Sequence, residues 1–199
     1  MKHRKISCRI KENKERGAWA ELYFMVLAMS YGLKVSSPYG GFRPYDVGVE
    51  DGTGPILRVQ VKCTGFLHPK GGYGFDLKGP GHRGYQRGTV DFFALYIIPT
   101  DDWFIVPYAV VGPRLANLHF TPGCKRRPRY GQYQEAWHLL VDAARPKDEG
   151  PIDIQACCSE EGTAQETREQ IDPAKSQRAI RNMFRRSIWR SERTQEDGR

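Results

Sequence analysis

The segment YDVGVEDGTGPILRVQVK, residues 45–62, decides the fold, because its pattern is that of a β-hairpin. Tyr45–Glu50 and Ile56–Lys62 both alternate apolar residues with other residues, as strands with one buried face do. The five residues between them, Asp51-Gly-Thr-Gly-Pro55, are typical of a turn. We therefore predict two antiparallel strands joined by a short loop.

The loop also predicts the register of the two strands. If the loop is symmetric, Glu50 pairs with Ile56, and Asp46 then lies opposite Gln60. Side chains alternate between the two faces of a strand. One face is therefore expected to be apolar, formed by Tyr45, Val47, Val49, Leu57, Val59 and Val61. The other face is expected to carry Asp46, Arg58, Gln60 and Lys62, with directly opposed Cβ atoms about 5 Å apart.

A carboxylate, an amide and an ammonium group on one patch suit the hydrolysis of a phosphodiester bond. Carboxylates and neutral oxygens bind Mg²⁺, which polarises a phosphate and lowers the pKa of a water molecule. Lys62 can orient that water or stabilise the developing negative charge. In this register the side chain of Val61 points away from the polar face, but its backbone carbonyl is a further candidate ligand. The same pattern also fits a solvated hairpin face with ordinary cross-strand pairs.

Upstream of the hairpin, the segment GAWAELYFMVLAMSY, residues 17–31, predicts a helix that ends before Gly32. A core-facing stripe is expected at Trp19, Leu22, Tyr23, Val26 and Leu27. Glu21 is the only charged residue between Ala18 and Ser30. A buried carboxylate is costly unless it is paired or binds a metal, so Glu21 is either an ion-pair partner or a member of the site.

The remaining elements complete an α/β fold. We predict strands at Tyr73–Leu77, Phe92–Ile98 and Trp103–Val106 and a closing helix at Gly131–Ala143, with Trp137 in the core. The expected architecture is a central mixed sheet of four to five strands flanked by helices.

Charge divides the chain into three parts: a basic arm (residues 1–16), a folded domain (17–145), and an acidic linker with a basic helical tail (146–199), which we expect to be largely disordered. Residues 1–145 hold 21 Lys and Arg against 12 Asp and Glu, a net charge of +9, whereas residues 146–199 hold 10 against 11, a net charge of −1. The basic excess belongs to the folded part, which favours a polyanionic partner.

The glycine-rich segment 65–89 is the expected place of nucleic-acid contacts, although a merely flexible insertion is the alternative. Eight glycines let the backbone approach phosphates, and two tyrosines, Tyr73 and Tyr85, lie among the basic residues. The predicted nucleic-acid contacts are Arg43, Arg58, Lys70, Lys78, Arg83 and Arg87.

Several classes of protein are excluded by composition. No apolar run approaches the roughly 20 residues that span a bilayer, and the charged N-terminus lacks the apolar core of a secretory signal. The five cysteines form an odd set without a Cys-x-x-Cys pair. We expect a cytoplasmic protein with reduced thiols and no membrane partner.

Three short motifs resemble those of the PD-(D/E)XK nuclease superfamily, and in particular its small stand-alone endonucleases, some of which are homing endonucleases. The motifs are Gly17-Ala-Trp-Ala-Glu21, Arg43-Pro-Tyr-Asp46 and Val59-Gln-Val-Lys62. Residues 90–96 and 102–107 also look like that branch. The resemblance spans about residues 15–143 and omits the tail.

The resemblance implies a restriction-endonuclease-like core in which Asp46 is a metal ligand, Lys62 the catalytic lysine and Glu21 a helix carboxylate of the site. Gln60 departs from the family pattern, which has Asp or Glu there in most members. The expected activity is Mg²⁺-dependent cleavage of double-stranded DNA, with Mn²⁺ as a substitute, by a homo-oligomer (dimer or tetramer). A homing, restriction or repair role stays open. The alternatives are an inactive nucleic-acid-binding protein of the same fold and an interaction protein whose charge aids solubility.

Overall fold

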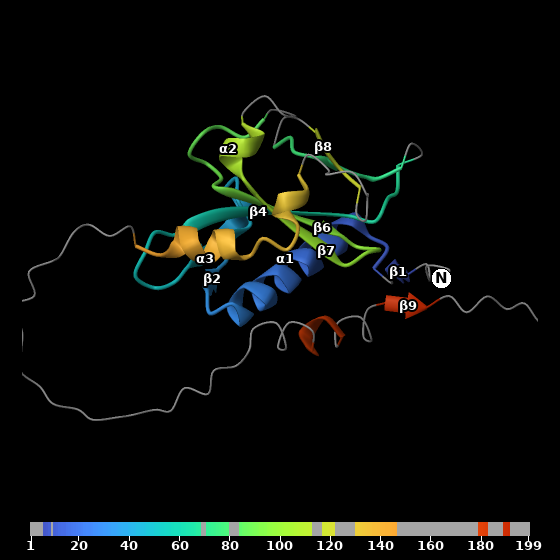
Figure 1. The fold of residues 1–199 in the computed structure, drawn as a ribbon, viewed down its shortest axis with the longest axis horizontal. Coiled ribbons are helices and arrows are strands. Elements are labelled where there is room, and N and C mark those ends of the chain that lie inside the picture. Colours follow the sequence, from blue (N-terminus) through green and yellow to red (C-terminus); the bar gives the residue numbers. More distant parts are fainter. Residues whose placement is uncertain are drawn as a thin grey trace, which may run out of the picture.

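The computed structural model of the chain (Figure 1) describes residues 6–8, 10–68, 71–79, 84–112, 117–121, 130–146, 179–182 and 189–191, with the backbone alone for 6–8 and 189–191. The helices are α1 (Asn13–Ser30), α2 (Tyr108–Val111) and α3 (His138–Ala144), with 3-10 turns η1 (Tyr39–Gly41) and η3 (Gly131–Tyr133). The strands are β1 (Ile6–Cys8), β2 (Lys34–Ser36), β3 (Val47–Glu50), β4 (Leu57–Thr64), β5 (Tyr73–Asp76), β6 (Phe92–Ile97), β7 (Asp102–Pro107), β8 (Asn117–Phe120) and β9 (Trp189–Ser191).

Five strands form a central mixed sheet in the order β2-β3-β4-β6-β7, in which β4 and β6 are parallel and the other pairs antiparallel. Two smaller sheets pair β5 with β8 and β1 with β9. The predicted hairpin register is confirmed, because Gly48 lies opposite Arg58 and Val49 opposite Leu57. Its turn is held by Asp51, whose Oδ1 accepts hydrogen bonds from the backbone N–H groups of Thr53 and Gly54 at 2.8 Å each.

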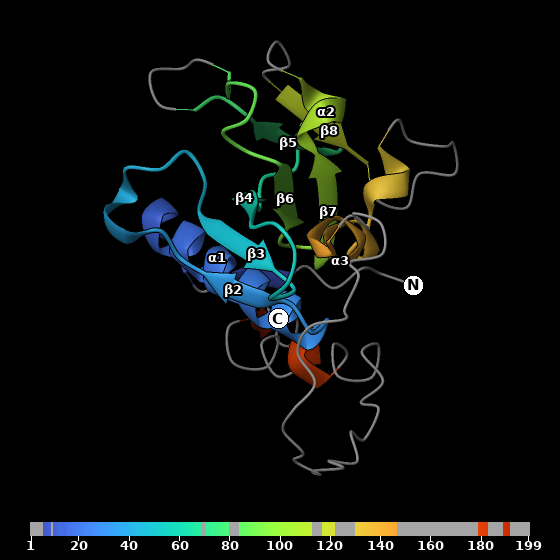
Figure 2. The same cartoon turned by 90° about the vertical axis from the view of Figure 1, so that its left-hand side faces the viewer.

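The central sheet has a hydrophobic core on each face. Helices α1 and α3 pack on one face, and the β5–β8 sheet and α2 cover the other (Figures 1 and 2). Successive residues of β6 enter the two cores in turn, since Phe92 and Ala94 belong to the first and Phe93 and Leu95 to the second. The strand predicted at Phe92–Ile98 is therefore confirmed, and both of its faces are buried.

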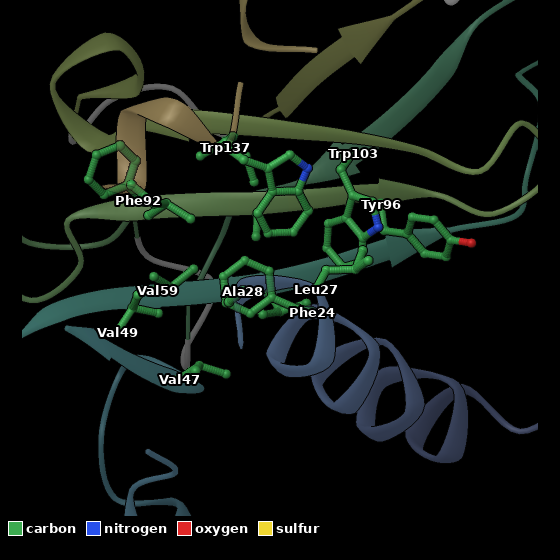
Figure 3. Packing of buried hydrophobic residues seen from close by; sticks show 14 of the residues in the cluster. Phe24, Leu27, Ala28, Val47, Val49, Val59, Phe92, Tyr96, Trp103 and Trp137 are labelled. Atoms are coloured by element: carbon green, nitrogen blue, oxygen red, sulfur yellow. The ribbon is translucent and has the colours of Figure 1, made fainter. Parts of the chain in front are cut away.

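A group of aromatic rings fixes α1 on the sheet (Figure 3). The Trp103 ring stacks on Tyr96 with centroids 4.6 Å apart, and it meets Phe24 at 5.7 Å and Trp137 at 5.8 Å. The helix begins at Asn13, four residues before the predicted start. Two residues of the expected stripe were wrong, because Leu22 is 61% exposed and Val26 is only partly buried and belongs to neither core. The buried face of α1 instead includes two alanines, Ala20 and Ala28.

The single closing helix predicted over residues 131–143 is wrong, since the chain forms η3 and α3 with a break between them. At the break Glu135 has a φ of 51°, in the left-handed region. Its N–H donates to the Trp103 carbonyl at 2.8 Å, and its carboxylate accepts from the Trp103 N–H and the Trp137 indole. These contacts with β7 hold residue 135 out of a helix.

A short piece of the C-terminal segment lies on the α1 side of the sheet. Residues 179–182 form one helical turn, Ile180 packs against the first core, and Arg181 forms a salt bridge with Glu135. The rest of the predicted linker and tail lies outside the described residues, apart from β9.

None of the helices described is long and apolar enough to cross a membrane. The Cys63 thiol donates a hydrogen bond to the Arg16 carbonyl at 3.6 Å.

Candidate active site

Asp46 lies one residue before β3, where β3 and β4 begin to separate. Its backbone N–H donates to the Val59 carbonyl at 3.0 Å, which continues the hairpin by one step. Its Oδ2 accepts a hydrogen bond from the Val61 N–H at 2.8 Å and another from the side-chain amide of Gln60. The carboxylate of Asp46 and the amide of Gln60 therefore meet, as the predicted register requires.

The predicted alternation of side chains between the two faces of the hairpin fails at Tyr45, the residue before Asp46. Tyr45 was expected beside Val47 in the first core, but it packs against the second core. Strand β3 begins only at Val47, so Tyr45 lies outside the regular strand geometry that would fix its face.

Lys62 supplies the positive charge of this patch. Burial raises the pKa of Asp46, and the Val61 N–H, the Lys62 ammonium group and the Gln60 amide each act against that rise. No carboxylate of the described residues comes within salt-bridge distance of Lys62. The ammonium group therefore acts on Asp46 through space, without a direct ion pair between them.

Glu21 approaches the same patch from α1, which packs across β4. The side chain is half-buried. Burial, and after it the negative charge of Asp46, raise the pKa of Glu21 from 4.5 to about 7. No salt bridge of the described residues includes Glu21. Glu21 therefore lies within electrostatic range of Asp46, and its membership of the site stays a prediction.

Glu21→Gln is expected to make the protein more stable above pH 7 and equally stable near pH 4. Because the pKa of Glu21 is higher in the folded chain, folding binds a proton between pH 4.5 and 7, and stability falls as the pH rises through that window. A pKa difference of one between the folded and unfolded chain corresponds to about 1.4 kcal/mol. Solvent screening of this half-buried group reduces the gain in free energy of unfolding to roughly 1–2 kcal/mol.

Urea denaturation at pH 4 and pH 8, in a chelating buffer, measures this difference. The matched control is Glu15→Gln, an exposed glutamate in the first turn of the same helix, which should gain no stability at pH 8 because negative charge is favourable at a helix N-terminus. An equal response of the two variants would mean that the surroundings of Glu21 do not disfavour its charge.

The candidate metal ligands at the patch are all oxygen atoms, which hard divalent cations prefer. They are the carboxylates of Glu21 and Asp46, the amide of Gln60 and the carbonyl of Val61. The Gln60 Nε2 donates both to Asp46 and to the Val61 carbonyl, the latter at 3.4 Å, so these two acceptors face one position. No three His, Cys, Asp or Glu side chains gather anywhere in the described ranges. The site thus fits a cation held partly by neutral ligands.

The predicted nucleic-acid contacts fall into three groups. Arg43 and Arg87 are exposed and Lys78 is partly buried. Arg58 is engaged by Asp91, with Nε–Oδ2 and Nη2–Oδ1 distances of 2.9 Å, and therefore ties β4 to the start of β6. Lys70 and Arg83 lie outside the described residues.

The two tyrosines of the glycine-rich segment are part of the second core rather than a surface for bases. Tyr85 nevertheless lies near the site, since burial and then the charges of Asp46 and Asp76 raise its pKa to about 12. Its ring packs edge-on against Phe93, which is the β6 neighbour of Gln60. No sequence pattern connects Tyr85 with Asp46, because a crossover between strands brings them together.

Comparison with known proteins identifies the family of the chain. The chain is similar to a bacterial homing endonuclease, I-Ssp6803I, with 26% identity and a TM-score of 0.57 over 66% of this chain and 94% of that one. It is also similar to the Holliday junction resolvase Hjc of Archaeoglobus fulgidus, with 16% identity and a TM-score of 0.38 over 54% and 84%. No curated protein matches the sequence. The family model described as PD-(D/E)XK endonuclease matches residues 11–140. The chain therefore belongs to the PD-(D/E)XK endonuclease family, and its fold is restriction-endonuclease-like.

Proposed function

We propose that this nuclease hydrolyses phosphodiester bonds in double-stranded DNA and depends on a divalent cation, Mg²⁺ by preference, with Mn²⁺ as a substitute. The observation that carries the proposal is the meeting of Asp46, Gln60 and the Val61 carbonyl beside Lys62. Membership of the endonuclease family supports the reaction type.

Asp46, Glu21, Gln60 and the Val61 carbonyl would hold the cation. When bound, the ion supplies Lewis-acid chemistry, which polarises the scissile phosphate and makes a water molecule more acidic. Rotation of the Gln60 amide by a half turn presents its oxygen in place of its nitrogen, so the side chain can change from donor to ligand.

Lys62 acts on the substrate in this proposal. Its ammonium group donates hydrogen bonds to a phosphate oxygen and stabilises the negative charge that builds up as water attacks. The hydrogen bonds that fix Asp46 to the backbone and side chain of β4 hold its carboxylate at a constant place relative to Lys62. The two groups are thus positioned before the substrate binds.

The net charge of the chain indicates the class of substrate. The net charge of +9 over residues 1–145 favours a polyanion, and binding of phosphates by Lys and Arg releases counterions. A homo-oligomer would place a second active site on the other strand of the duplex.

Incubation of the purified chain with supercoiled plasmid tests the proposal. We expect nicked and then linear plasmid with Mg²⁺ or Mn²⁺, no cleavage in a chelator, and recovery of cleavage when the cation is restored in excess. Intact plasmid under all of these conditions, at protein concentrations that bind DNA, would contradict the proposal.

Gln60 favours a second candidate, an inactive nucleic-acid-binding protein, because an amide binds Mg²⁺ more weakly than a carboxylate. Gln60→Glu separates the two candidates. A wild-type chain that binds DNA but does not cut it, together with a Gln60→Glu variant that cuts, would select the inactive protein.

A further inference from the structure

Exposed apolar side chains gather in the two segments that lead out of the site. In the β2–β3 loop Tyr39 is 97% and Phe42 89% exposed, and after β4 Phe66 is 69% and Leu67 58% exposed. The first segment ends at Asp46 and the second begins just after Lys62. Strands β3 and β4 are antiparallel, so both segments leave the sheet at the end where the site lies. The β2–β3 loop, light blue in Figure 2, extends beyond the sheet.

Phe42 follows a turn that two glycines form. Gly40 and Gly41 have φ angles of 79° and 63°, in the left-handed region that other residues rarely adopt. A Cβ atom on Gly40 would come within 2.5 Å of the Phe42 Cε2 atom. The ring therefore lies against the Gly40 backbone, and its exposure is a feature of a defined turn.

The charge around these aromatic groups indicates the partner. The sequence has no Asp or Glu between Glu21 and Asp46, and none between Asp51 and Asp76. Arg43, next to Phe42, is exposed. An exposed aromatic ring beside an exposed guanidinium group is complementary to nucleic acid, which presents phosphates outside and stacking faces inside.

Phe42 can reach the bases that adjoin a phosphate held at the site. Phe42 and Asp46 are four positions apart in the sequence, so the chain allows at most about 14 Å between their backbones. The grooves of duplex DNA are roughly 8 Å deep. A ring at that distance from the scissile phosphate lies within range of the base edges.

We propose that Phe42 inserts into the base stack next to the phosphate that the site holds, and so acts as a wedge that opens one base step. The inference rests on the proposed function for the identity of the substrate. Apolar wedges of this kind partly unstack one step and kink the duplex. Pyrimidine–purine steps unstack most easily, so the wedge gives the nuclease a preference for such a step near the cut without any hydrogen bond to a base.

Fluorescence of 2-aminopurine, which rises when the base is unstacked, tests the wedge in the full chain. The probe is a duplex of alternating T and A with scattered 2-aminopurine, bound by the Lys62→Met chain in a chelating buffer so that the DNA stays intact. We expect a rise in fluorescence on binding and weaker affinity for an equally long duplex with all A on one strand. Adding Phe42→Ala should abolish the rise and lower affinity about ten- to a hundredfold, the usual effect of one stacking ring.

Two matched variants complete the experiment. Phe42→Trp should keep the fluorescence rise, and Ile56→Ala, a 56% exposed residue at the other end of the hairpin, should change nothing. A fluorescence rise that persists in Phe42→Ala, or no rise in any tight complex, overturns the wedge and leaves the proposed function standing. A change of oligomeric mass in Phe42→Ala with unaltered DNA affinity also overturns it. Absence of both DNA binding and plasmid cleavage in the wild-type chain refutes the proposed function itself.

Discussion

Lys62→Met is expected to slow DNA cleavage by about a hundred- to a thousandfold, the usual effect of removing one preorganised group that stabilises charge in the transition state. Methionine retains the length of the side chain and its apolar stem but lacks the ammonium group. Lys62 lies partly exposed on β4, and it has no salt bridge among the described residues. The fold and the affinity for DNA should therefore change little.

Single-turnover cleavage measures the rate, a gel shift in chelator measures DNA affinity, and thermal unfolding checks the fold. Lys14→Met, at an exposed position of α1, removes the same charge far along the chain and should cut at the wild-type rate. If both variants cut equally well, Lys62 has no role in the chemical step. If Lys62→Met loses affinity and not rate, its role is ordinary phosphate binding.

The second large effect is expected on stability. Trp103→Ala should lower the free energy of unfolding by about 3–5 kcal/mol, as other removals of buried aromatic rings do, from a total of about 5–15 kcal/mol for an ordinary domain. Trp103 is fully buried and joins β7 to Tyr23 and Phe24 of α1, to Tyr96 of β6 and to Trp137 before α3. Its loss leaves a cavity where the sheet and both helices meet.

Urea denaturation followed by circular dichroism measures the change. Trp103→Phe keeps an aromatic ring and should cost less than Trp103→Ala. Met29→Ala, at a position that is 60% exposed on α1, should change stability by less than about 0.5 kcal/mol. A loss below about 1 kcal/mol for Trp103→Ala would show that this cluster does not hold α1 on the sheet. Because α1 carries Glu21, the same variant should also reduce cleavage at temperatures well below unfolding.

The hairpin could be predicted from the sequence because its determinants are local. Alternation fixes the faces of Val47–Val49 and Leu57–Val61, and the turn chemistry of Asp51 fixes the register. The pairing of Asp46 with Gln60 followed from these two facts alone. The buried run of β6 was equally visible, because both of its faces meet a core.

The features that could not be predicted depend on contacts between residues that are far apart in the sequence. The break at Glu135 arises from hydrogen bonds to Trp103, 32 positions earlier, and a helical pattern over residues 131–143 carries no trace of them. The face of α1 was misjudged at Leu22 because small alanines, which an apolar stripe does not highlight, fill the contact with the sheet. The structural partner of Arg58 was likewise invisible, since Asp91 reaches it only across a crossover.

The parallel pairing of β4 with β6 has a consequence for synthesis of the chain. All the proposed site residues belong to the stretch that ends with β4 at Thr64, whereas the strand that covers the open edge of β4 begins at Phe92. At about 5–20 residues per second, the ribosome needs roughly 1–5 seconds to make the stretch between them. During that interval the nascent hairpin has an unpaired edge at β4, which can pair with other chains. We therefore expect chaperones to bind the nascent chain at this stage.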